Sequence, residues 1–416
     1  MPRIDPGNVP PVGRFDDRST VVVVGAALAG LRAAEELRAA GYGGRLVFVG
    51  AEDHLPYDRP PLSKEVLAGE WDLGQTALRK QPYEDLDLDW RLGRRAAALD
   101  ARARTVSLAD GERLSFDGAV LATGAVPRTL PGTPPLPGIH LLRSLDDCEA
   151  LRDELARGPR VVVVGAGFIG AEVAATCRGR GLSVTVLEAL PAPMVRGLGP
   201  VLGDALGRLH RDHGVDLRLG VGVAGFEGGD RVEAVLLGDG TRVAADVVVV
   251  GIGVRPATDW LEGAGLRIDD GVVCDATCQA APGIVAAGDV ARWPSALYDG
   301  ESIRLEHWTN AAEQGAFVGR RLLAGDGAAP SFDPVPFVWS DQYDVKIQVA
   351  GSVRGDDRIE VVDGSLAEQR FVAAVGRDGR LVGAVGFSRP RPLMHYRRLI
   401  AERVPFDDAV ASQRAS

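Results

Sequence analysis

Residues 161–181 read VVVVGAGFIGAEVAATCRGRG, and residues 21–41 read VVVVGAALAGLRAAEELRAAG. The two stretches match in register at a constant offset of 140 residues. Each joins a β-branched run to a glycine turn and an alanine-rich stretch that ends in glycine, the pattern of a strand, a tight turn and a helix. Residues 117–128 (DGAVLATGAVPR) and 245–256 (ADVVVVGIGVRP) also match each other, as apolar strands that lead into small residues and a proline. We therefore predict an α/β chain with two complete Rossmann-like folds.

The order of the segments predicts that one fold is inserted into the other. Residues 283–293 (GIVAAGDVARW) give a third strand pattern with no glycine fingerprint of its own, so we expect this strand to complete the first sheet. Hairpin patterns follow from Phe332, with Arg377-Asp378-Gly379 at a turn, and predict a small α+β domain with an antiparallel sheet and a last helix near residues 393–403. The predicted parts are a flexible tail (1–18), the first fold (19–128 and 257–331), the inserted second fold (129–256) and the C-terminal domain (332–416).

The composition excludes several classes of protein. With 46% hydrophobic and 25% charged residues, the 416-residue chain is of ordinary globular type rather than disordered or fibrous. The 57 acidic and 47 basic side chains give a net charge of −10, which argues against nucleic acid as the main partner. No apolar run approaches the ~18 residues of a membrane span, and the N-terminus has no stretch of signal-peptide type. We expect a cytoplasmic protein with no membrane partner.

The glycine turn of the second fold has the full G-x-G-x-x-G spacing, at Gly165, Gly167 and Gly170. Glycines let a pyrophosphate approach the backbone, and the helix N-terminus offers free N–H groups and a partial positive charge. The next strand, 184–187, is followed by Glu188. A carboxylate there accepts hydrogen bonds from an adenosine ribose and repels a 2′-phosphate, so the second fold is predicted to bind NADH rather than NADPH. The alternative is a glycine turn needed only for tight packing.

The glycine turn of the first fold is less regular, because Ala27 replaces its central glycine. The acid that is expected at the end of the second strand is displaced as well. Gly50 stands at the strand end that corresponds to Glu188, and Glu52 is the first carboxylate that follows. We predict that Glu52 binds a ribose; a solvated loop acid is the alternative.

Seven motifs between residues 20 and 390 carry a family resemblance. They are HLPYDRPPLSKEVLAGE (54–70), LATGAVPR (121–128), GAGFIGAEVA (165–174), GIGVRPATDWLEGAGL (251–266), AAGDVARW (286–293), EHWTNAAEQG (306–315) and FVWSDQYDVKIQVAG (337–351). They resemble the FAD-dependent ferredoxin reductases of the putidaredoxin reductase and aromatic-dioxygenase reductase type, within the pyridine nucleotide-disulfide oxidoreductase superfamily. The resemblance implies FAD in the first fold, NADH in the inserted fold and a C-terminal domain that lines the flavin.

The glycine-turn patterns and the resemblance together give the residues that are expected to hold the cofactors. The candidates for FAD are Gly25, Ala29, Gly30, Glu52, Arg59, Lys64, Thr123, Gly124, Arg128, Asp289 and Trp308. The candidates for NADH are Gly165, Gly167, Phe168, Ile169, Gly170, Glu172, Glu188 and Gly253. Asp289 could instead cap the following helix, and Trp308 could be a core tryptophan.

The chain lacks the thiols of the disulfide reductases in the wider superfamily. Those enzymes carry a redox-active cysteine in or just after the first βαβ unit, whereas no cysteine precedes Cys148 here. The spacing of Cys274 and Cys278 fits neither a CxxC redox pair nor a closed zinc site. We therefore predict no thiol chemistry and no metal site.

Three side chains remain as catalytic candidates. The resemblance places Lys64 beside the flavin and Glu172 opposite it, where the pair would balance charge near the flavin N5 atom. Only three lysines occur in the chain, and retention of one here supports a role for a compact ammonium, although chance retention is an alternative. Trp339 is the candidate for an aromatic near the nicotinamide or on the electron exit route, or else an ordinary core tryptophan.

The predicted function is hydride transfer from NADH to FAD, followed by release of single electrons to a [2Fe-2S]-type ferredoxin that serves an oxygenase. Rubredoxin is the second choice of partner, and a monomer and a homodimer are both compatible with the sequence. One alternative is an NADH-dependent reductase of a small-molecule acceptor such as a quinone or a radical. Another is a redox-sensing NAD- and FAD-binding protein of the apoptosis-inducing-factor kind.

An acidic ferredoxin would need a local basic surface on this acidic chain. The candidates are arginines near the C-terminus and two on an earlier helix: Arg389, Arg391, Arg397, Arg398, Arg320 and Arg321. A solvated charged face is the alternative reading of this cluster.

Overall fold

The computed structural model describes residues 15–325 and 329–414. Residues 1–14, most of the predicted tail, lie outside the described residues. The chain forms two compact units, each made of three segments. Unit 1 runs up to Asp58 and includes Ala77–Val126 and Arg255–Pro334, whereas unit 2 comprises Arg59–Thr76, Pro127–Val254 and Val335–Ser416. Residues 59–76, which follow the first βαβ pattern in the sequence, thus pack within unit 2; the functional domain boundaries stay a prediction.

Unit 1 is built on a six-stranded sheet in the order β19-β20-β7-β1-β2-β3. Its strands are β1 (Thr20–Val24), β2 (Arg45–Val49), β3 (Leu88–Arg91), β7 (Gly118–Leu121), β19 (Gln279–Ala281) and β20 (Ile284–Ala286). The four central strands from β20 to β2 are parallel, with Val22 of β1 opposite Val47 of β2 and Ala119 of β7. The late strand β20 therefore returns to the first sheet, as the sequence predicts.

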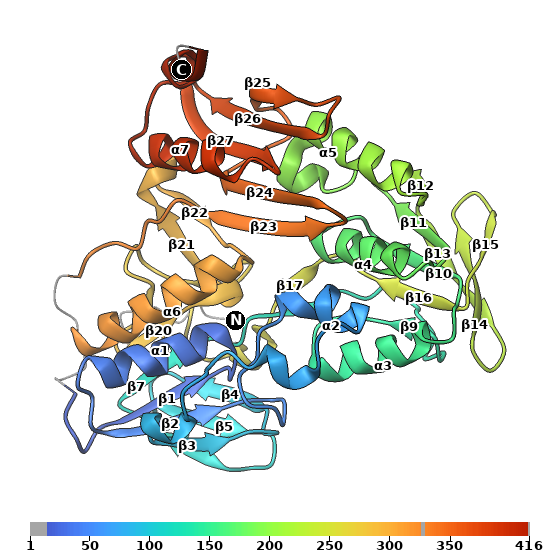
Figure 1. The fold of residues 1–416 in the computed structure, drawn as a ribbon. Helices are drawn as coiled ribbons and strands as arrows, with labels where there is room; N and C mark the ends of the chain where they lie inside the picture. Colours follow the sequence, from blue (N-terminus) through green and yellow to red (C-terminus); the bar gives the residue numbers. More distant parts are fainter. Residues whose placement is uncertain (1–14, 326–328, 415–416) are drawn as a thin grey trace. The chain divides into compact units, whose positions relative to one another are not determined.

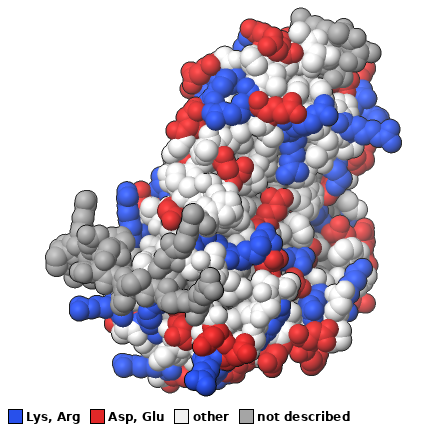
Figure 2. Space-filling model, turned by 90° about the vertical axis from the view of Figure 1, so that its left-hand side faces the viewer, with Lys and Arg blue, Asp and Glu red and all other residues white. Residues whose placement is uncertain are grey.

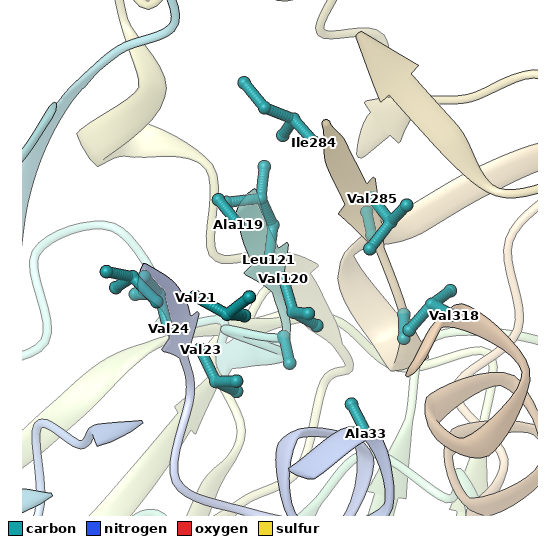
Figure 3. Packing of buried hydrophobic residues seen from close by; sticks show 14 of the residues in the cluster. Val21, Val23, Val24, Ala33, Ala119, Val120, Leu121, Ile284, Val285 and Val318 are labelled. Carbon is teal, nitrogen blue, oxygen red and sulfur yellow. The ribbon is translucent and has the colours of Figure 1, made fainter. Parts of the chain in front are cut away.

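The core of unit 1 forms because these strands are apolar on both faces, as expected of buried parallel strands. Val21, Val22 and Val23 are 0% exposed. Figure 3 shows β1, β7 and β20 side by side, with Ala33 of helix α1 (Leu28–Ala39) and Val318 of helix α6 (Trp308–Leu323) directed at them. The two helices pack with their backbones close together (Figure 1), since a Cβ atom at Gly315 would lie 2.4 Å from the Ala29 carbonyl oxygen.

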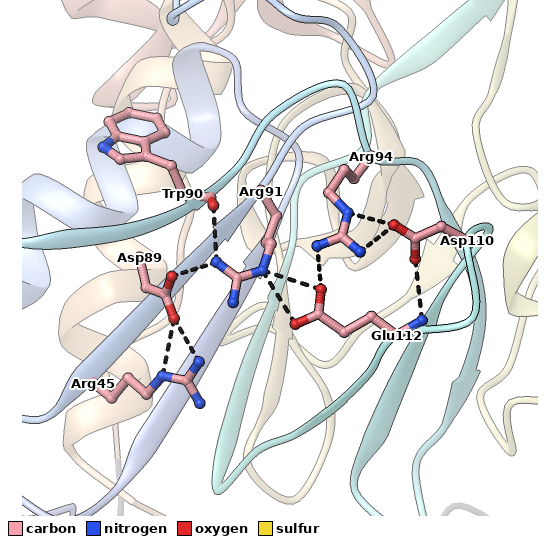
Figure 4. A network of polar contacts seen from close by, with 7 residues as sticks. All are labelled: Arg45, Asp89, Trp90, Arg91, Arg94, Asp110 and Glu112. Carbon is pink, nitrogen blue, oxygen red and sulfur yellow. Dashed lines mark hydrogen bonds and ion pairs between the residues drawn. The ribbon is translucent and has the colours of Figure 1, made fainter.

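Smaller elements complete unit 1. They are the antiparallel sheet β4 (Ala96–Asp100), β5 (Thr105–Leu108) and β6 (Arg113–Ser115), and the sheet β18 (Val272–Val273), β21 (Ala291–Ser295) and β22 (Glu301–Ile303). A chain of alternating charges joins the edge strand β3 to the β5–β6 hairpin (Figure 4). Arg91 bridges Asp89 and Glu112, and Glu112 also pairs with Arg94. The Arg91–Glu112 pair thus ties the edge strand β3 to the turn between β5 and β6.

Unit 2 contains a five-stranded parallel sheet in the order β12-β11-β10-β16-β9. Its elements are β9 (Ile139–His140), α3 (Leu145–Leu155), β10 (Val161–Val164), α4 (Phe168–Gly179), β11 (Val184–Glu188), α5 (Val195–Asp212), β12 (Asp216–Leu219) and β16 (Val247–Val250). Val162 lies between Thr185 of β11 and Val248 of β16, as Val22 lies between β2 and β7 in unit 1. The repeated sequence therefore folds into the same central three-strand arrangement twice.

Unit 2 also contains the C-terminal sheet, in the order β23-β24-β27-β26-β25. Its elements are β23 (Phe337–Gln342), β24 (Val345–Gly351), β25 (Arg358–Ser365), β26 (Arg370–Arg377), β27 (Arg380–Phe387), α7 (Pro390–Ala401) and α8 (Phe406–Arg414). Asp378 and Gly379 both have positive φ, as a tight hairpin turn between β26 and β27 requires. The structure also contains α8, a final helix that was not predicted from the sequence.

The remaining elements of the chain are short. Unit 2 holds the 3-10 turn η2 (Pro60–Ser63), helix α2 (Glu65–Ala68) and the sheet β13 (Val223–Gly228), β14 (Val232–Leu237) and β15 (Arg242–Ala244). Two of the five points at which the chain passes between the units lie in β8 (Ala125–Pro127) and β17 (Val254–Pro256).

Candidate functional site

The glycine turn of unit 1 is shaped to receive a phosphate group. Gly25 has φ +124°, and a Cβ atom there would lie 2.0 Å from the Ala122 carbonyl oxygen; at Gly30 it would lie 2.1 Å from the Gly25 oxygen. The N-cap residue of α1, Ala27, has no side-chain acceptor for the first N–H groups of the helix. These groups, with the positive end of the helix dipole, fit the pyrophosphate of a dinucleotide.

The glycine turn of unit 2 repeats this geometry. Gly165 has φ +99°, and its Cβ atom would lie 2.4 Å from the Gly251 oxygen; that of Gly170 would lie 2.0 Å from the Gly165 oxygen. At Gly167, the N-cap of α4, no atom lies within 4 Å of an added Cβ. The middle position is therefore open, which explains sterically how the first fold accommodates Ala27.

Glu188 ends β11 and holds the second glycine turn. Its Oε2 atom accepts a hydrogen bond from the Ala166 N–H across 2.7 Å, and its Oε1 atom accepts one from the Leu190 N–H across 2.8 Å. A carboxylate fixed in this way retains lone pairs for a ribose. Its binding role stays a prediction.

The first fold has a glycine, Gly50, at the position that corresponds to Glu188. A Cβ atom at Gly50 would lie 2.6 Å from the Cβ of Ala26. Glu52, two residues later, is half-buried and accepts a hydrogen bond from the Tyr57 hydroxyl. The carboxylate is thus anchored, as a ribose ligand would be, rather than fully solvated.

Other predicted FAD residues of unit 1 come from distant segments. Gly288, next to Asp289, packs against the first glycine turn, since its Cβ would lie 3.1 Å from that of Ala29. Asp289 lies in the 3-10 turn η6 (Gly288–Val290) rather than at an N-cap. Trp308 begins α6, and its Nε1 donates to Asp58 across 2.7 Å.

The predicted residues Thr123 and Gly124 follow β7. The Thr123 hydroxyl donates to the Ala257 carbonyl oxygen across 2.9 Å, and Gly124 has φ +68°. Near the start of α6, the Nδ1 atom of His307 and the Oδ1 atom of Asn310 are buried without a protein partner. Orphaned polar atoms and a glycine cradle in one unit fit the polar groups of a bound FAD.

Lys64 and Glu172 form a buried ion pair in unit 2. Lys64 Nζ donates to Glu172 Oε2 across 3.0 Å, and the side chains are 12% and 5% exposed. Lys64 joins η2 to α2, and Glu172 lies near the start of α4. The Thr176 hydroxyl of α4 donates to the Ser63 carbonyl oxygen across 2.7 Å, which holds η2 against the helix. The predicted partnership is present, and its role beside a flavin stays a prediction.

Two serines that the sequence reading missed also bind this carboxylate. Ser63 donates to Glu172 Oε2, and Ser340 of β23 donates to Oε1 across 2.7 Å. Ser340 and Gln342 are buried while their neighbours Trp339 and Asp341 are half-buried. Polar residues at the inward positions of an alternating strand were the signal that could have found them.

The other predicted residues of unit 2 lie in several places. Arg59 donates to the Arg143 carbonyl oxygen, and Arg128 donates from Nε to the Val254 oxygen across 3.0 Å. Ile169, at the start of α4, is 42% exposed, which leaves it accessible to a ligand. The half-buried Phe168 and Trp339 and the exposed Gly253 complete the set.

The four thiols are unsuited to redox chemistry. Cys148, Cys177, Cys274 and Cys278 are all free and buried. Burial raises the pKa of Cys148 to about 11 and the pKa values of Cys177 and Cys278 to about 12, and it raises the pKa of Cys274 well above its ordinary value. Since the thiolate is the reactive form, the prediction of unreactive cysteines agrees with their environment.

The proposed basic docking cluster needs a correction. Arg321 is 6% exposed and donates to Thr277 and Gln279, so it is a structural residue and not part of a surface. Arg320 pairs with Glu36, and Arg389 pairs with Asp363. Figure 2 shows basic and acidic side chains interspersed on the face that it displays. The interpretation as a basic cluster fails for Arg321 because a guanidinium can satisfy its donors inside the protein.

Two further searches cover the described part of the chain. Within it, no helix is long and apolar enough to cross a membrane. Among the same residues, no group of three or more His, Cys, Asp or Glu side chains is arranged to hold a metal ion.

Comparison with known proteins gives a consistent result. The family model described as pyridine nucleotide-disulphide oxidoreductase matches residues 19–315, and the model described as reductase C-terminal matches residues 337–416. The ferredoxin reductase component of chlorobenzene dioxygenase from Cupriavidus sp. (strain PS12) is 39% identical over 392 residues, which cover 94% of each protein. Putidaredoxin reductase of Pseudomonas putida is 37% identical over 396 residues, 93% of each. A chain of the covalent putidaredoxin reductase-putidaredoxin complex matches with a TM-score of 0.90 and 34% identity, over 96% of this chain and 100% of that chain.

Proposed function

The chain belongs to the pyridine nucleotide-disulphide oxidoreductase family, as an FAD-dependent ferredoxin reductase, and from this premise we propose that it takes a hydride from NADH onto FAD and passes single electrons to a ferredoxin. The ferredoxin is a small iron–sulfur protein that serves an oxygenase. The relative from Cupriavidus sp. is named as the ferredoxin reductase component of a dioxygenase, and the relative from Pseudomonas putida is named as a putidaredoxin reductase.

The main support for this proposal is a combination of three features. Each unit has a glycine turn at the start of a helix, Lys64 pairs with Glu172, and all four thiols are buried. Each unit offers uncapped helix N–H groups to a pyrophosphate. The burial of all four thiols argues against a cysteine relay for the electrons. A protein with two dinucleotide sites and no redox-active dithiol can take two electrons from NADH and release them one at a time through its flavin.

We assign FAD to the glycine turn of unit 1 and NADH to that of unit 2. When bound, FAD accepts a hydride from the nicotinamide and releases its electrons one at a time. The chain supplies binding and electrostatics: Gly25 and Gly30 give the backbone access to one pyrophosphate, Gly165 and Gly170 to the other, and Glu188 selects against a 2′-phosphate.

Lys64 and Glu172 contribute fixed charges. An ammonium that is held at a defined atom by a buried carboxylate is already oriented, so it stabilises developing negative charge without reorganising. We propose that this ammonium supplies the positive charge that balances the reduced FAD. Trp339, which precedes Ser340 on β23, is proposed to lie near the nicotinamide.

The experiment is an electron-transfer assay on the FAD-loaded protein. NADH is mixed with the protein and a panel of ferredoxins, and cytochrome c reduction is followed. The expected result is a rate that depends on ferredoxin and saturates with its concentration. An equally high rate without ferredoxin, or with a quinone in its place, would identify a small-molecule reductase instead. Flavin that NADH does not reduce would point to a sensor.

We place the protein in the cytoplasm. The four cysteines are unpaired thiols, which suits a reducing compartment where NADH is available.

A further inference from the structure

The Glu172 carboxylate is the end of a longer hydrogen-bonded chain in unit 2. From Glu172 the chain runs to Ser340 and Gln342 of β23, then to His210 of α5, and ends at Tyr343. The successive distances are 2.7 Å, 3.0 Å, 3.0 Å and 2.9 Å. Glu172, Ser340, Gln342 and His210 are all buried. Three elements, α4, β23 and α5, are thereby joined through buried polar side chains.

The contacts determine which group donates and which accepts in each hydrogen bond, starting from the Glu172 carboxylate. A carboxylate paired with an ammonium only accepts hydrogen bonds, so Ser340 donates its one proton to Glu172. Ser340 must then accept at its second contact, which means that Gln342 turns its NH₂ group toward Ser340. The carbonyl oxygen of Gln342 consequently faces His210.

The same reasoning fixes the histidine. A carbonyl oxygen cannot donate, so His210 carries its proton on Nε2, and its Nδ1 atom accepts from the Tyr343 hydroxyl. Burial lowers the pKa of His210 to about 4, in agreement with a neutral imidazole that has one donor and one acceptor nitrogen. Every proton in the chain therefore points toward Glu172.

We propose that Ser340, Gln342, His210 and Tyr343 are positioning residues that aim a one-directional chain of donors at Glu172 and so fix the Lys64–Glu172 pair for the flavin reaction. The proposal rests on the proposed function. A proton relay would require each group to exchange its donor and acceptor roles. The Gln342 amide can exchange them only by rotating, so this hydrogen-bonded chain does not relay protons. It orients the carboxylate, with Ser340 on Oε1 and with Ser63 and Lys64 on Oε2.

The decisive variants are Ser340→Thr and Ser340→Val. Their side chains have nearly the same shape, and each adds a methyl group to the same buried position, but only threonine keeps the hydroxyl. We expect the threonine variant to retain NADH-dependent reduction of FAD and the valine variant to lose about tenfold, the loss that accompanies one hydrogen bond to a charged group. Tyr343→Phe, at the far end of the chain, should change the rate less than Ser340→Val.

The second readout is the tautomer of His210, from ¹⁵N NMR of histidine-labelled protein, with His210→Gln for assignment. The wild type and Ser340→Thr should show the proton on Nε2 alone. Ser340→Val should populate both tautomers, because the Ser340 hydroxyl then no longer fixes the direction of the Gln342 amide, and only the 3.9 Å contact of Nε2 with Met194 Sδ remains. An unchanged tautomer in Ser340→Val, or equal FAD reduction in the two variants, would overturn the proposal.

If either variant fails to fold, Ser340→Ala, which removes the hydroxyl without adding volume, makes the same comparison with the wild type. Failure of the wild type to reduce a ferredoxin would refute the proposed function and leave the tautomer result to stand by itself.

Discussion

Lys64 Nζ lies 3.0 Å from Glu172 Oε2, and the two side chains are 12% and 5% exposed. A charge pair taken out of water in this way depends on both partners, because removal of one leaves the other buried and uncompensated. A residue 108 positions away in the sequence thus determines the environment of the lysine that the sequence singled out.

Removal of one charge should therefore destabilise the protein more than removal of both. We expect Glu172→Gln to lower the free energy of unfolding by about 3 kcal/mol and Lys64→Met/Glu172→Gln to recover part of this loss. The measurement is urea unfolding of the FAD-loaded protein. Asp204→Asn, which removes the exposed pair with Arg208 on α5, is the control and should cost less than about 0.5 kcal/mol. A double variant no more stable than the single one would show that the pair is not coupled.

The second glycine turn offers a matched pair of alanine substitutions. Gly170→Ala should destabilise unit 2 and abolish NADH binding, because the new Cβ would lie 2.0 Å from the Gly165 oxygen. Gly167→Ala meets no atom within 4 Å and should fold normally, with at most a weaker affinity for NADH. Thermal melting and NADH titration check both. Equal melting temperatures for the two variants would contradict the steric account.

Glu188 should set the choice between NADH and NADPH. Glu188→Gln keeps the length of the side chain but removes the charge that repels a 2′-phosphate. We expect the KM for NADPH to fall and the KM for NADH to rise, whereas Glu233→Gln, at an exposed position of β14, should leave both unchanged. Steady-state kinetics with each nucleotide decide the point, and equal KM values for NADH and NADPH in the wild type would refute the assignment.

His210 predicts a loss of stability in mild acid. Burial lowers the pKa of His210 from 6.5 to about 4, with His213 acting in the same direction and the Gln342 hydrogen bond opposing it. The Tyr343 ring also contacts His210. Between pH 6.5 and 4 the unfolded chain therefore binds one more proton than the folded chain. The free energy of unfolding should fall by up to about 1.4 kcal/mol per pH unit as the pH decreases through this window, with no contribution from His210 above it.

The measurement for His210 is urea unfolding across this pH range. His210→Gln should show a shallower slope than the wild type. The same slope in both proteins would mean that His210 does not remain neutral in the folded state.

The repeated strand-turn-helix patterns predicted most of the fold, because apolar periodicity and glycine spacing are local signals. The insertion, the return of β20 to the first sheet and the hairpin at Asp378-Gly379 follow from such signals. The packing of residues 59–76 within unit 2 does not, since it depends on contacts between distant segments.

The residues of the site also fall into those that the sequence predicted and those that depend on contacts between distant segments. Glu188 was predicted from its place at a strand end, and the Lys64–Glu172 pair from family resemblance. Ser340, Gln342 and His210 were missed because a polar chain through the core becomes visible only when three elements are packed together. Arg321 was assigned wrongly because the sequence does not tell whether an arginine on an amphipathic helix faces water or the buried partners Thr277 and Gln279.

The central claim, that electrons pass from NADH through FAD to a ferredoxin without any thiol, is tested most directly on a cysteine-free protein. All four cysteines are replaced by alanine, and ferredoxin-dependent cytochrome c reduction by NADH is measured beside the wild type. We predict the same ferredoxin-dependent kcat in both proteins, since the four thiols are buried and their pKa values are raised. Complete loss of activity in a cysteine-free protein that still folds and binds FAD would contradict the account.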